Sequence, residues 1–207
     1  PPGAHQGPVA QVRLDADVSR AIAELESMLP GTEFTPRVLE ELRGAYAPGM
    51  GMADAFAPWL ESLLGSRGLV VYDSSDPAAK PLLAALFAHE IQHAGATRRL
   101  TPEAGAALEA LGYHAQATPQ EGSLALFHLN DGREAIRRDG DGFLVGDRRE
   151  TKDTLLERVR RSPGSFSPNV LLRPLAQDTL FPTICYLGGP SEVAYLAQLR
   201  PVYGRLG

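Results

Sequence analysis

The sequence predicts an α/β fold with a parallel sheet, from three observations. Leu69–Tyr72 and Thr183–Leu187 are short, continuously apolar runs, as found in strands that are buried on both faces of a parallel sheet. Each run leads through a polar or Gly-Pro turn into a helical pattern, which is one half of a doubly wound unit. At about residues 123–147, two turn signals separate short strands and predict a small antiparallel insertion.

Residues 1–66 are predicted to form a helical lead-in, and residues 67–207 the core portion that carries the sheet. Apolar residues recur with helical spacing over residues 15–29. Thr35-Pro36 supplies an N-cap and a proline at the first position of a second helix. A third helix is expected at about Met52–Leu64.

The core portion contains further elements of both kinds. Helical patterns follow Pro77 and cover 101–111, 151–159 and 191–199, and a further strand is expected at 113–117.

Composition narrows the function classes. The 207 residues are 43% hydrophobic and carry a net charge of −5, which favours a globular domain and argues against a nucleic-acid surface or a polybasic membrane anchor. No apolar run has the roughly 18 to 20 residues of a membrane span. The single cysteine, Cys185, cannot form an internal disulfide and is expected to be a buried structural thiol, so we expect a cytoplasmic protein.

The chain starts with Pro1, and no basic-then-apolar leader follows it. We therefore expect a piece of a longer protein.

One motif suggests a metal site. His89, Glu90 and His93 spell H-E-x-x-H, which on a helix places two histidines on one face, where they can bind zinc while the glutamate activates a water. Glu109 is a conceivable further ligand, but no third histidine follows at the spacing of longer zinc motifs. In the alternative interpretation, these residues are the polar face of an amphipathic helix.

A polar turn follows the first predicted strand. In open α/β sheets ligands bind beyond the carboxyl ends of strands, so Asp73 and Ser75 are candidate binding residues. Equally, Asp and Ser are ordinary turn residues, and Asp76 before Pro77 would cap the next helix.

The stretch Ser167–Tyr195 combines several features of a binding site. A strand that ends in Gly188-Gly189 and opens a helix lets the backbone approach a ligand closely. Polar residues stand among apolar ones there, and Arg173 could bind a carboxylate with both arms of its guanidinium. In the alternative interpretation, Arg173 and Glu192 pair with each other and hold a loop.

The same stretch, SPNVLLRPLAQDTLFPTICYLGGPSEVAYLAQL, resembles the bacillithiol biosynthesis cysteine-adding enzymes, the BshC family of cysteine ligases. RGLVVYDSSDP is similar to that family's strand and turn, and GMADAF and GDGF fall in the expected order. The resemblance covers nearly the whole chain.

The resemblance implies a Rossmann-like core with helical connecting segments, and an activity that joins L-cysteine to glucosaminyl-malate through an amide bond. It places the family's C-terminal core motif, near the ligand cleft, on Ser167, Asn169, Arg173, Gln177, Gly188, Gly189 and Glu192. Activation of the carboxyl would use ATP, although the chain has no phosphate-binding motif, and no individual catalytic role is assigned.

The family's upstream phosphate-type loop and its long terminal coiled coil are missing from these residues. The resemblance therefore implies a middle portion of the enzyme, with small-molecule substrates, no nucleic acid, no membrane, and a homodimer formed through parts absent from this chain. Two alternatives stay open at this point: a zinc metallopeptidase and a non-catalytic ligand-binding domain.

Overall fold

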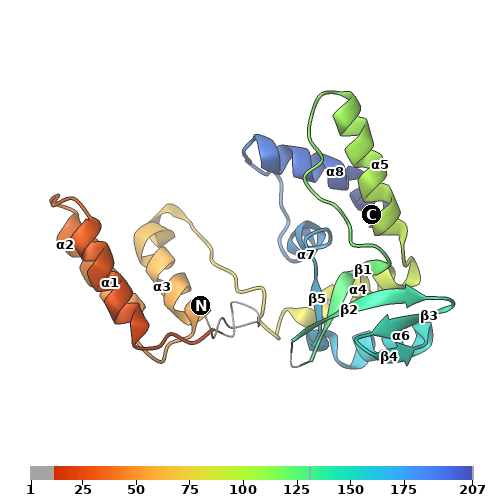
Figure 1. Cartoon of the computed structure of the whole chain (residues 1–207), viewed down its shortest axis with the longest axis horizontal. Helices are drawn as coiled ribbons and strands as arrows, with labels where there is room; N and C mark the ends of the chain where they lie inside the picture. Colours follow the sequence, from red (N-terminus) through yellow and green to blue (C-terminus); the bar gives the residue numbers. More distant parts are fainter. Residues whose placement is uncertain (1–11, 131, 207) are drawn as a thin grey trace. The chain divides into compact units, whose positions relative to one another are not determined.

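The computed structural model describes residues 12–130 and 132–206 (Figure 1). Its contacts divide the chain into two units, with the boundary between Ser75 and Asp76. The α/β class is confirmed, because the second unit combines a five-stranded sheet with helices.

The first unit is helical, as predicted. It contains α1 (Asp17–Met28), α2 (Thr35–Ala45), α3 (Met52–Leu64) and a 3₁₀ turn at Gly65–Arg67. Each long helix buries one apolar side chain, namely Ile22, Leu39 and Ala55. The Thr-Pro start of α2 and the bounds of α3 agree with the prediction from the sequence.

The helices of the second unit differ from the prediction in three respects: where α5 begins, where α8 ends, and the presence of α7. The unit contains two 3₁₀ turns (Lys80–Leu83 and Pro163–Ser165) and the helices α4 (Ala84–Gln92), α5 (Ala96–Ala110), α6 (Lys152–Arg161), α7 (Arg173–Leu180) and α8 (Pro190–Leu206). Because Pro102 lacks only one N–H donor, α5 continues through it and starts five residues before the predicted Thr101. α7 was not predicted, and α8 runs past the expected end. Throughout the described ranges, every helix is too short or too polar to cross a membrane.

The sheet is an antiparallel meander with one returning strand. Its strands are β1 (Ser123–Leu129), β2 (Arg133–Asp139), β3 (Gly142–Val145), β4 (Arg148–Glu150) and β5 (Phe166–Pro168). Their order is β4-β3-β2-β1-β5, and every neighbouring pair is antiparallel. The predicted antiparallel element is confirmed in β1–β3.

The predicted parallel strands are not found among the described residues. Leu69–Tyr72, Thr183–Leu187 and residues 113–117 form no strand, and the predictions for these three segments are wrong. Val70 is 78% exposed and Ile184 fully exposed, so neither run is buried. An apolar run becomes a buried strand only where neighbouring strands take up its N–H and C=O groups, and the described sheet offers none to these runs.

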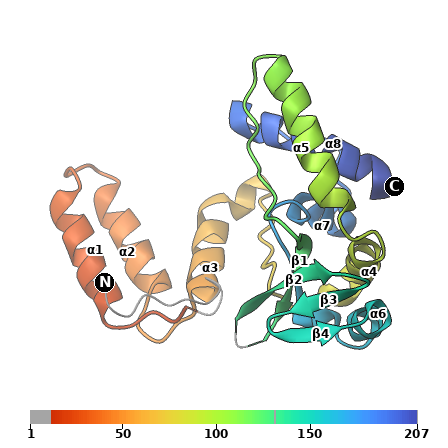
Figure 2. The ribbon, with the colours of Figure 1, turned by 45° about the vertical axis from the view of Figure 1, so that its right-hand side comes forward.

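One apolar core joins the elements of the second unit. α4 packs on β1 and on α6, and α5 lies beside both β1 and α8 (Figures 1 and 2). The fully buried side chains come from α4, the sheet, α6 and α8, and they include Phe87, Ile91, Leu126, Ile136, Val145, Leu155, Val159, Phe166 and Leu199.

A buried carboxylate connects three of these elements. Glu90 of α4 is 4% exposed; its Oε1 accepts the N–H of Ala125 in β1 at 2.8 Å, and its Oε2 accepts the hydroxyl of Thr97 in α5 at 2.6 Å. Burial raises the pKa of Glu90, although both hydrogen bonds act in the opposite direction.

A buried amide fixes the segment before the sheet. Gln198 of α8 is completely buried, and its Oε1 accepts the N–H groups of Gln116 and Ala117, each at 3.0 Å. Its Nε2 donates to the carbonyls of Ala117 at 2.7 Å and Thr101 at 3.2 Å. This amide therefore satisfies backbone groups that a neighbouring strand would otherwise satisfy.

We expect Gln198→Ala to destabilise the chain by about 3 kcal/mol, because it leaves buried backbone groups without partners. Urea unfolding measures the loss. Gln92→Ala, which removes an exposed amide from α4, is the control and should change the free energy of unfolding by less than about 0.5 kcal/mol. Equal effects of the two substitutions would contradict the role given to Gln198.

Glu90→Gln should change how stability depends on pH. Because the pKa of Glu90 is raised in the folded state, its contribution is full below about pH 4.5 and is lost as the pH rises through the folded-state pKa. Glutamine carries no charge; its oxygen can accept the Ala125 N–H, and its NH2 group can donate to the Thr97 hydroxyl oxygen, which reverses the direction of that bond. We therefore expect the stability of the variant relative to the parent chain to increase between about pH 4 and pH 8. Urea unfolding over this range tests it, and a difference that does not vary with pH argues against it.

Candidate functional site

A cleft of about 480 Å³ lies in the second unit between α7, residues 183–186 and α8. We call it the α7–α8 cleft. Arg173 and Gln177, four residues apart on one face of α7, both line it, as do Tyr186 and Tyr195. The structure thus brings together two of the residues that the sequence singled out, and adds two tyrosines that it did not.

Arg173 is free to meet a ligand. Its side chain is exposed and has no carboxylate partner in the described part of the chain, so the expected pairing with Glu192 is not found. Backbone hydrogen bonds hold its position at the start of α7, because the Arg173 N–H donates to the carbonyl of Asn169 at 3.0 Å.

Glu192 caps the helix that follows the Gly-Gly turn. Its Oε2 accepts the N–H of Gly189 at 2.9 Å, as in a capping box, and its Oε1 accepts the hydroxyl of Tyr186 at 3.0 Å. The pKa of Glu192 lies below its ordinary value, mainly because of the hydrogen bond from the Gly189 N–H and secondly because of the one from the Tyr186 hydroxyl. A Cβ on Gly188 would lie 3.0 Å from side-chain atoms of both Glu192 and Tyr186, so a larger residue there would need both side chains to shift slightly. Of these residues, Tyr186 lines the α7–α8 cleft, whereas Gly188, Gly189 and Glu192 do not.

Asn169 and Ser167 support the start of α7. Asn169 Oδ1 accepts the N–H of Leu171 at 2.8 Å, and the Asn169 N–H donates to the carbonyl of Ala125 at 3.0 Å. Asn169 and Arg173 also line a neighbouring cavity of about 340 Å³. Ser167 is buried in β5 opposite Phe127 and does not line the α7–α8 cleft.

Asp73 and Ser75 belong to the first unit and are not among the residues that line the α7–α8 cleft. Asp73 Oδ1 accepts the N–H of Ser75 at 2.7 Å, which closes an Asx turn. Both side chains are exposed.

The H-E-x-x-H motif lies at the end of α4. The rings of His89 and His93 lie 4.2 Å apart, but Glu90 between them is buried in the contacts with α5 and β1. Burial, followed by the nearby charges of His93 and Arg205, lowers the pKa of His89. Within residues 12–130 and 132–206, no three His, Cys, Asp or Glu side chains gather as a metal site would require. The zinc interpretation is therefore not supported.

The sequence missed the aromatic part of the cleft. The Tyr195 hydroxyl donates to the carbonyl of Val170, and burial raises the pKa of Tyr195. Tyr203 donates to Asp178 Oδ2 at 2.7 Å; burial, then this bond, raises the pKa of Tyr203. Cys185 is exposed on the cleft, so the prediction of a buried thiol is wrong. The spacing of Tyr195 and Tyr203 on α8, eight residues apart, was the available signal.

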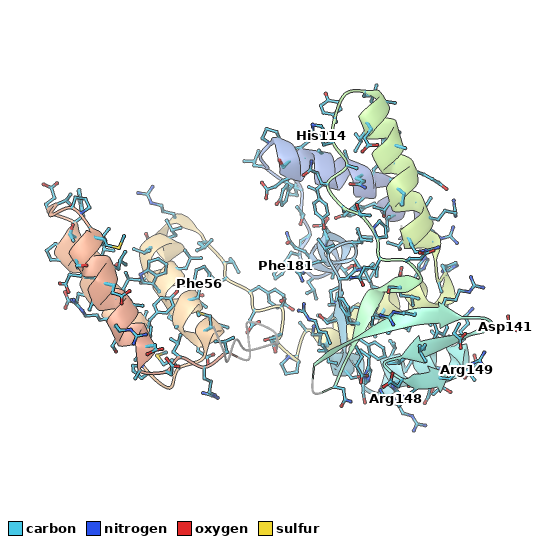
Figure 3. All side chains as sticks on the ribbon, viewed as in Figure 1. Phe56, His114, Asp141, Arg148, Arg149 and Phe181 are labelled. Carbon is cyan, nitrogen blue, oxygen red and sulfur yellow. The ribbon has the colours of Figure 1, made fainter. Side chains whose placement is uncertain are left out.

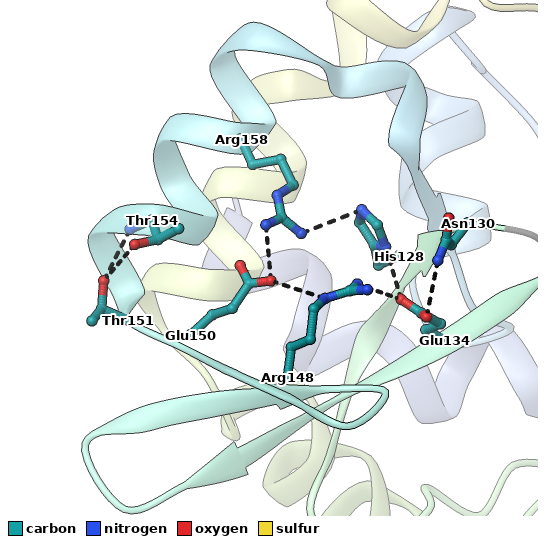
Figure 4. A network of polar contacts seen from close by, with 8 residues as sticks. All are labelled: His128, Asn130, Glu134, Arg148, Glu150, Thr151, Thr154 and Arg158. Atoms are coloured by element: carbon teal, nitrogen blue, oxygen red, sulfur yellow. Dashed lines mark hydrogen bonds and ion pairs between the residues drawn. The ribbon is translucent and has the colours of Figure 1, made fainter.

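A second polar cluster connects the sheet with α6 (Figure 4). His128 Nδ1 lies 3.1 Å from Glu134 Oε2, and Arg148 Nη2 lies 2.8 Å from the same oxygen. Arg158 Nη2 lies 2.8 Å from Glu150 Oε1. Desolvation acts to raise the pKa of Glu134, but its hydrogen bonds with His128, Asn130 and Arg148 hold it below the ordinary value.

The two arginines of this cluster balance the charges of its two glutamates. We therefore interpret it as a structural ion-pair network that links β1, β2, β4 and α6, rather than as a reaction centre.

The family model and the curated relatives that match this chain carry the same family name. A family model described as "Bacillithiol biosynthesis BshC, N-terminal Rossmann-like domain" matches residues 2–207. Three similar relatives are named "Putative cysteine ligase BshC". The one from Koribacter versatilis is 37% identical over 205 residues, covering 99% of this chain and 38% of the relative. The one from Salinibacter ruber is 40% identical over 205 residues, covering 97% and 37%. The one from Chlorobaculum tepidum is 36% identical over 200 residues, covering 94% and 35%.

The chain therefore spans somewhat more than a third of the length of these relatives. The match runs through both units and includes the α7–α8 cleft. These findings support neither the metallopeptidase nor the non-catalytic alternative. The matching model is that of the family's N-terminal domain, so the expectation of a middle portion is wrong. The chain belongs to the BshC family of bacillithiol biosynthesis, within its N-terminal Rossmann-like domain.

Proposed function

We propose that this chain is the substrate-holding part of a cysteine ligase that adds L-cysteine to glucosaminyl-malate. The names of its relatives and the description of the matching family support this activity. In the reaction, the carboxyl carbon of cysteine forms a bond to the amino nitrogen of the glucosamine, with the overall loss of water.

The observation that carries the proposal is the unpaired guanidinium of Arg173 at the α7–α8 cleft. The malate group of the acceptor has two carboxylates, and arginine binds a carboxylate through two parallel N–H···O bonds. Gln177, one turn further along α7, adds an amide that can donate to or accept from the sugar hydroxyls.

The remaining predicted residues have supporting roles in this proposal. Asn169 holds the start of α7, and Ser167 precedes it in β5. Glu192 holds the turn at Gly188 and Gly189 and the hydroxyl of Tyr186, which lines the cleft. For Asp73 and Ser75, which belong to the first unit, we keep the proposal of a substrate-binding role without assigning them to the α7–α8 cleft.

The proposal also covers the setting of the enzyme. We place it in the cytoplasm, consistent with thiol metabolism and a single free cysteine. We further propose that residues 1–66 are a connecting segment and 67–207 a portion of the core, and that dimerisation uses regions beyond this chain.

We expect Arg173→Ala to weaken binding of glucosaminyl-malate by roughly 10- to 100-fold, the loss of a charge-assisted pair worth about 1.5–3 kcal/mol. Titration calorimetry with the 207-residue chain measures the affinity. Arg160→Ala is the matched control, because Arg160 is an exposed arginine of α6 that pairs with Glu157 away from the cleft. Equal affinity of the Arg173→Ala variant and the parent chain would contradict the site.

The activity is tested separately by incubating the chain with cysteine and glucosaminyl-malate and searching for the amide product by mass spectrometry. Binding without product would limit this chain to holding the substrate. If the chain neither binds glucosaminyl-malate nor forms the product, the proposal is contradicted.

A further inference from the structure

A second large cavity of the second unit lies outside the α7–α8 cleft. It measures about 860 Å³ and is formed by the corner between α4 and α5, the loop before β1, and the turn between β2 and β3. We call it the basic cavity. Asp141, at the tip of that turn, marks its sheet side in Figure 3.

Positive charge dominates the lining of this cavity. Five cationic side chains line it, against the two carboxylates of Glu121 and Asp141; the five are Arg98, Arg99, Arg138, Lys152 and Arg205. The whole chain has a net charge of −5, so this local excess runs against its composition. A cavity lined by charges of one sign concentrates counter-ions from solution.

Most of these cations have no carboxylate partner. Arg99 pairs with Glu103 outside the cavity, whereas the other four form no ion pair with any described residue. Lys152 Nζ donates to the Gln92 carbonyl at 3.3 Å, and Arg138 Nε to the Gly140 carbonyl at 3.4 Å. Their charges therefore stay uncompensated.

The start of α5 adds donors to the same cavity. Gly95, with φ +91°, turns the chain from α4 into α5, and no side chain caps the helix. In the described structure, the N–H groups of Thr97 and Arg98 have no acceptor. Free N–H groups at a helix N-terminus attract negative charge.

We propose that the basic cavity binds a small ligand with two or more adjacent negative charges, such as a phosphoryl chain or a dicarboxylate. Arg98 and Arg205 provide the charge-assisted hydrogen bonds, and the N–H groups at the start of α5 provide neutral donors. Arginine suits both kinds of anion, because its fork matches carboxylate and phosphate oxygens.

This site is separate from the one proposed for the ligase reaction. Arg98 and Ser123 also line the cavity of about 340 Å³ that reaches Arg173, so the two sites are neighbours without sharing their central arginines. The inference does not depend on the ligase activity.

Titration calorimetry of the full chain with inorganic pyrophosphate, and in a second arm with succinate, tests the inference. We expect saturable binding of one equivalent, weakened by salt between about 0.05 M and 0.3 M because the interaction is ionic. Arg98→Ala and Arg205→Ala should each weaken it about tenfold or more, and Arg98→Lys should weaken it less. Tighter binding of pyrophosphate than of succinate identifies a phosphoryl ligand, and the reverse a dicarboxylate.

Arg160→Ala is again the control and should leave the affinity unchanged. Circular dichroism checks that the variants are folded, which we expect because the substituted side chains are exposed. No saturable binding of either anion, or an equal loss in the Arg160→Ala variant, overturns the inference. Arg173→Ala should leave pyrophosphate binding intact, which separates this result from the test of the proposed function.

Discussion

The arrangement of the second unit depends on one buried carboxylate. Glu90 receives a backbone N–H from β1 and a hydroxyl from α5, so the helix that carries it is fixed against the sheet and against the next helix at once. The corner at Gly95, the uncapped start of α5 and the basic cavity all follow from that placement. A glutamate in an apolar core is retained here because both its oxygens have partners.

The sequence predicted those elements that are determined by their own residues. The helix Met52–Leu64 and the meander from Ser123 depend on local spacing and turn residues, and both are present. The run Thr183–Leu187 failed because strand formation needs a neighbour, and the described part of the chain supplies none. α7 was missed because Arg173-Pro174 follows an apolar run that looked continuous with its surroundings. Gln198 takes over the hydrogen bonds of residues 116–117, which no pattern of apolar residues reveals.

The residues of the candidate site could likewise be predicted only where they depend on local sequence. Arg173 and Gln177 could be found from polarity among apolar residues, since both stand on one face of a single helix. Glu192 could not be assigned in this way, because a carboxylate at that position serves equally as a ligand contact or as a helix cap, and the structure shows the cap. The tyrosines of α8 enter the cleft through packing between elements far apart in sequence. The H-E-x-x-H spelling allowed both a zinc site and a polar helix face, and only the structure shows that Glu90 is buried in contacts with β1 and α5.

The order of the sheet has a consequence for folding. β1 to β4 are consecutive in the chain and joined by short turns, so they can pair before the residues that follow have been synthesised. The hydrogen bonds of Gln198 with Ala117 and Thr101 span 81 and 97 residues. They can form only when α8 has left the ribosome, and their loop-closure entropy makes them a late step. The meander is therefore the natural nucleus, and the C-terminal helix completes the unit last.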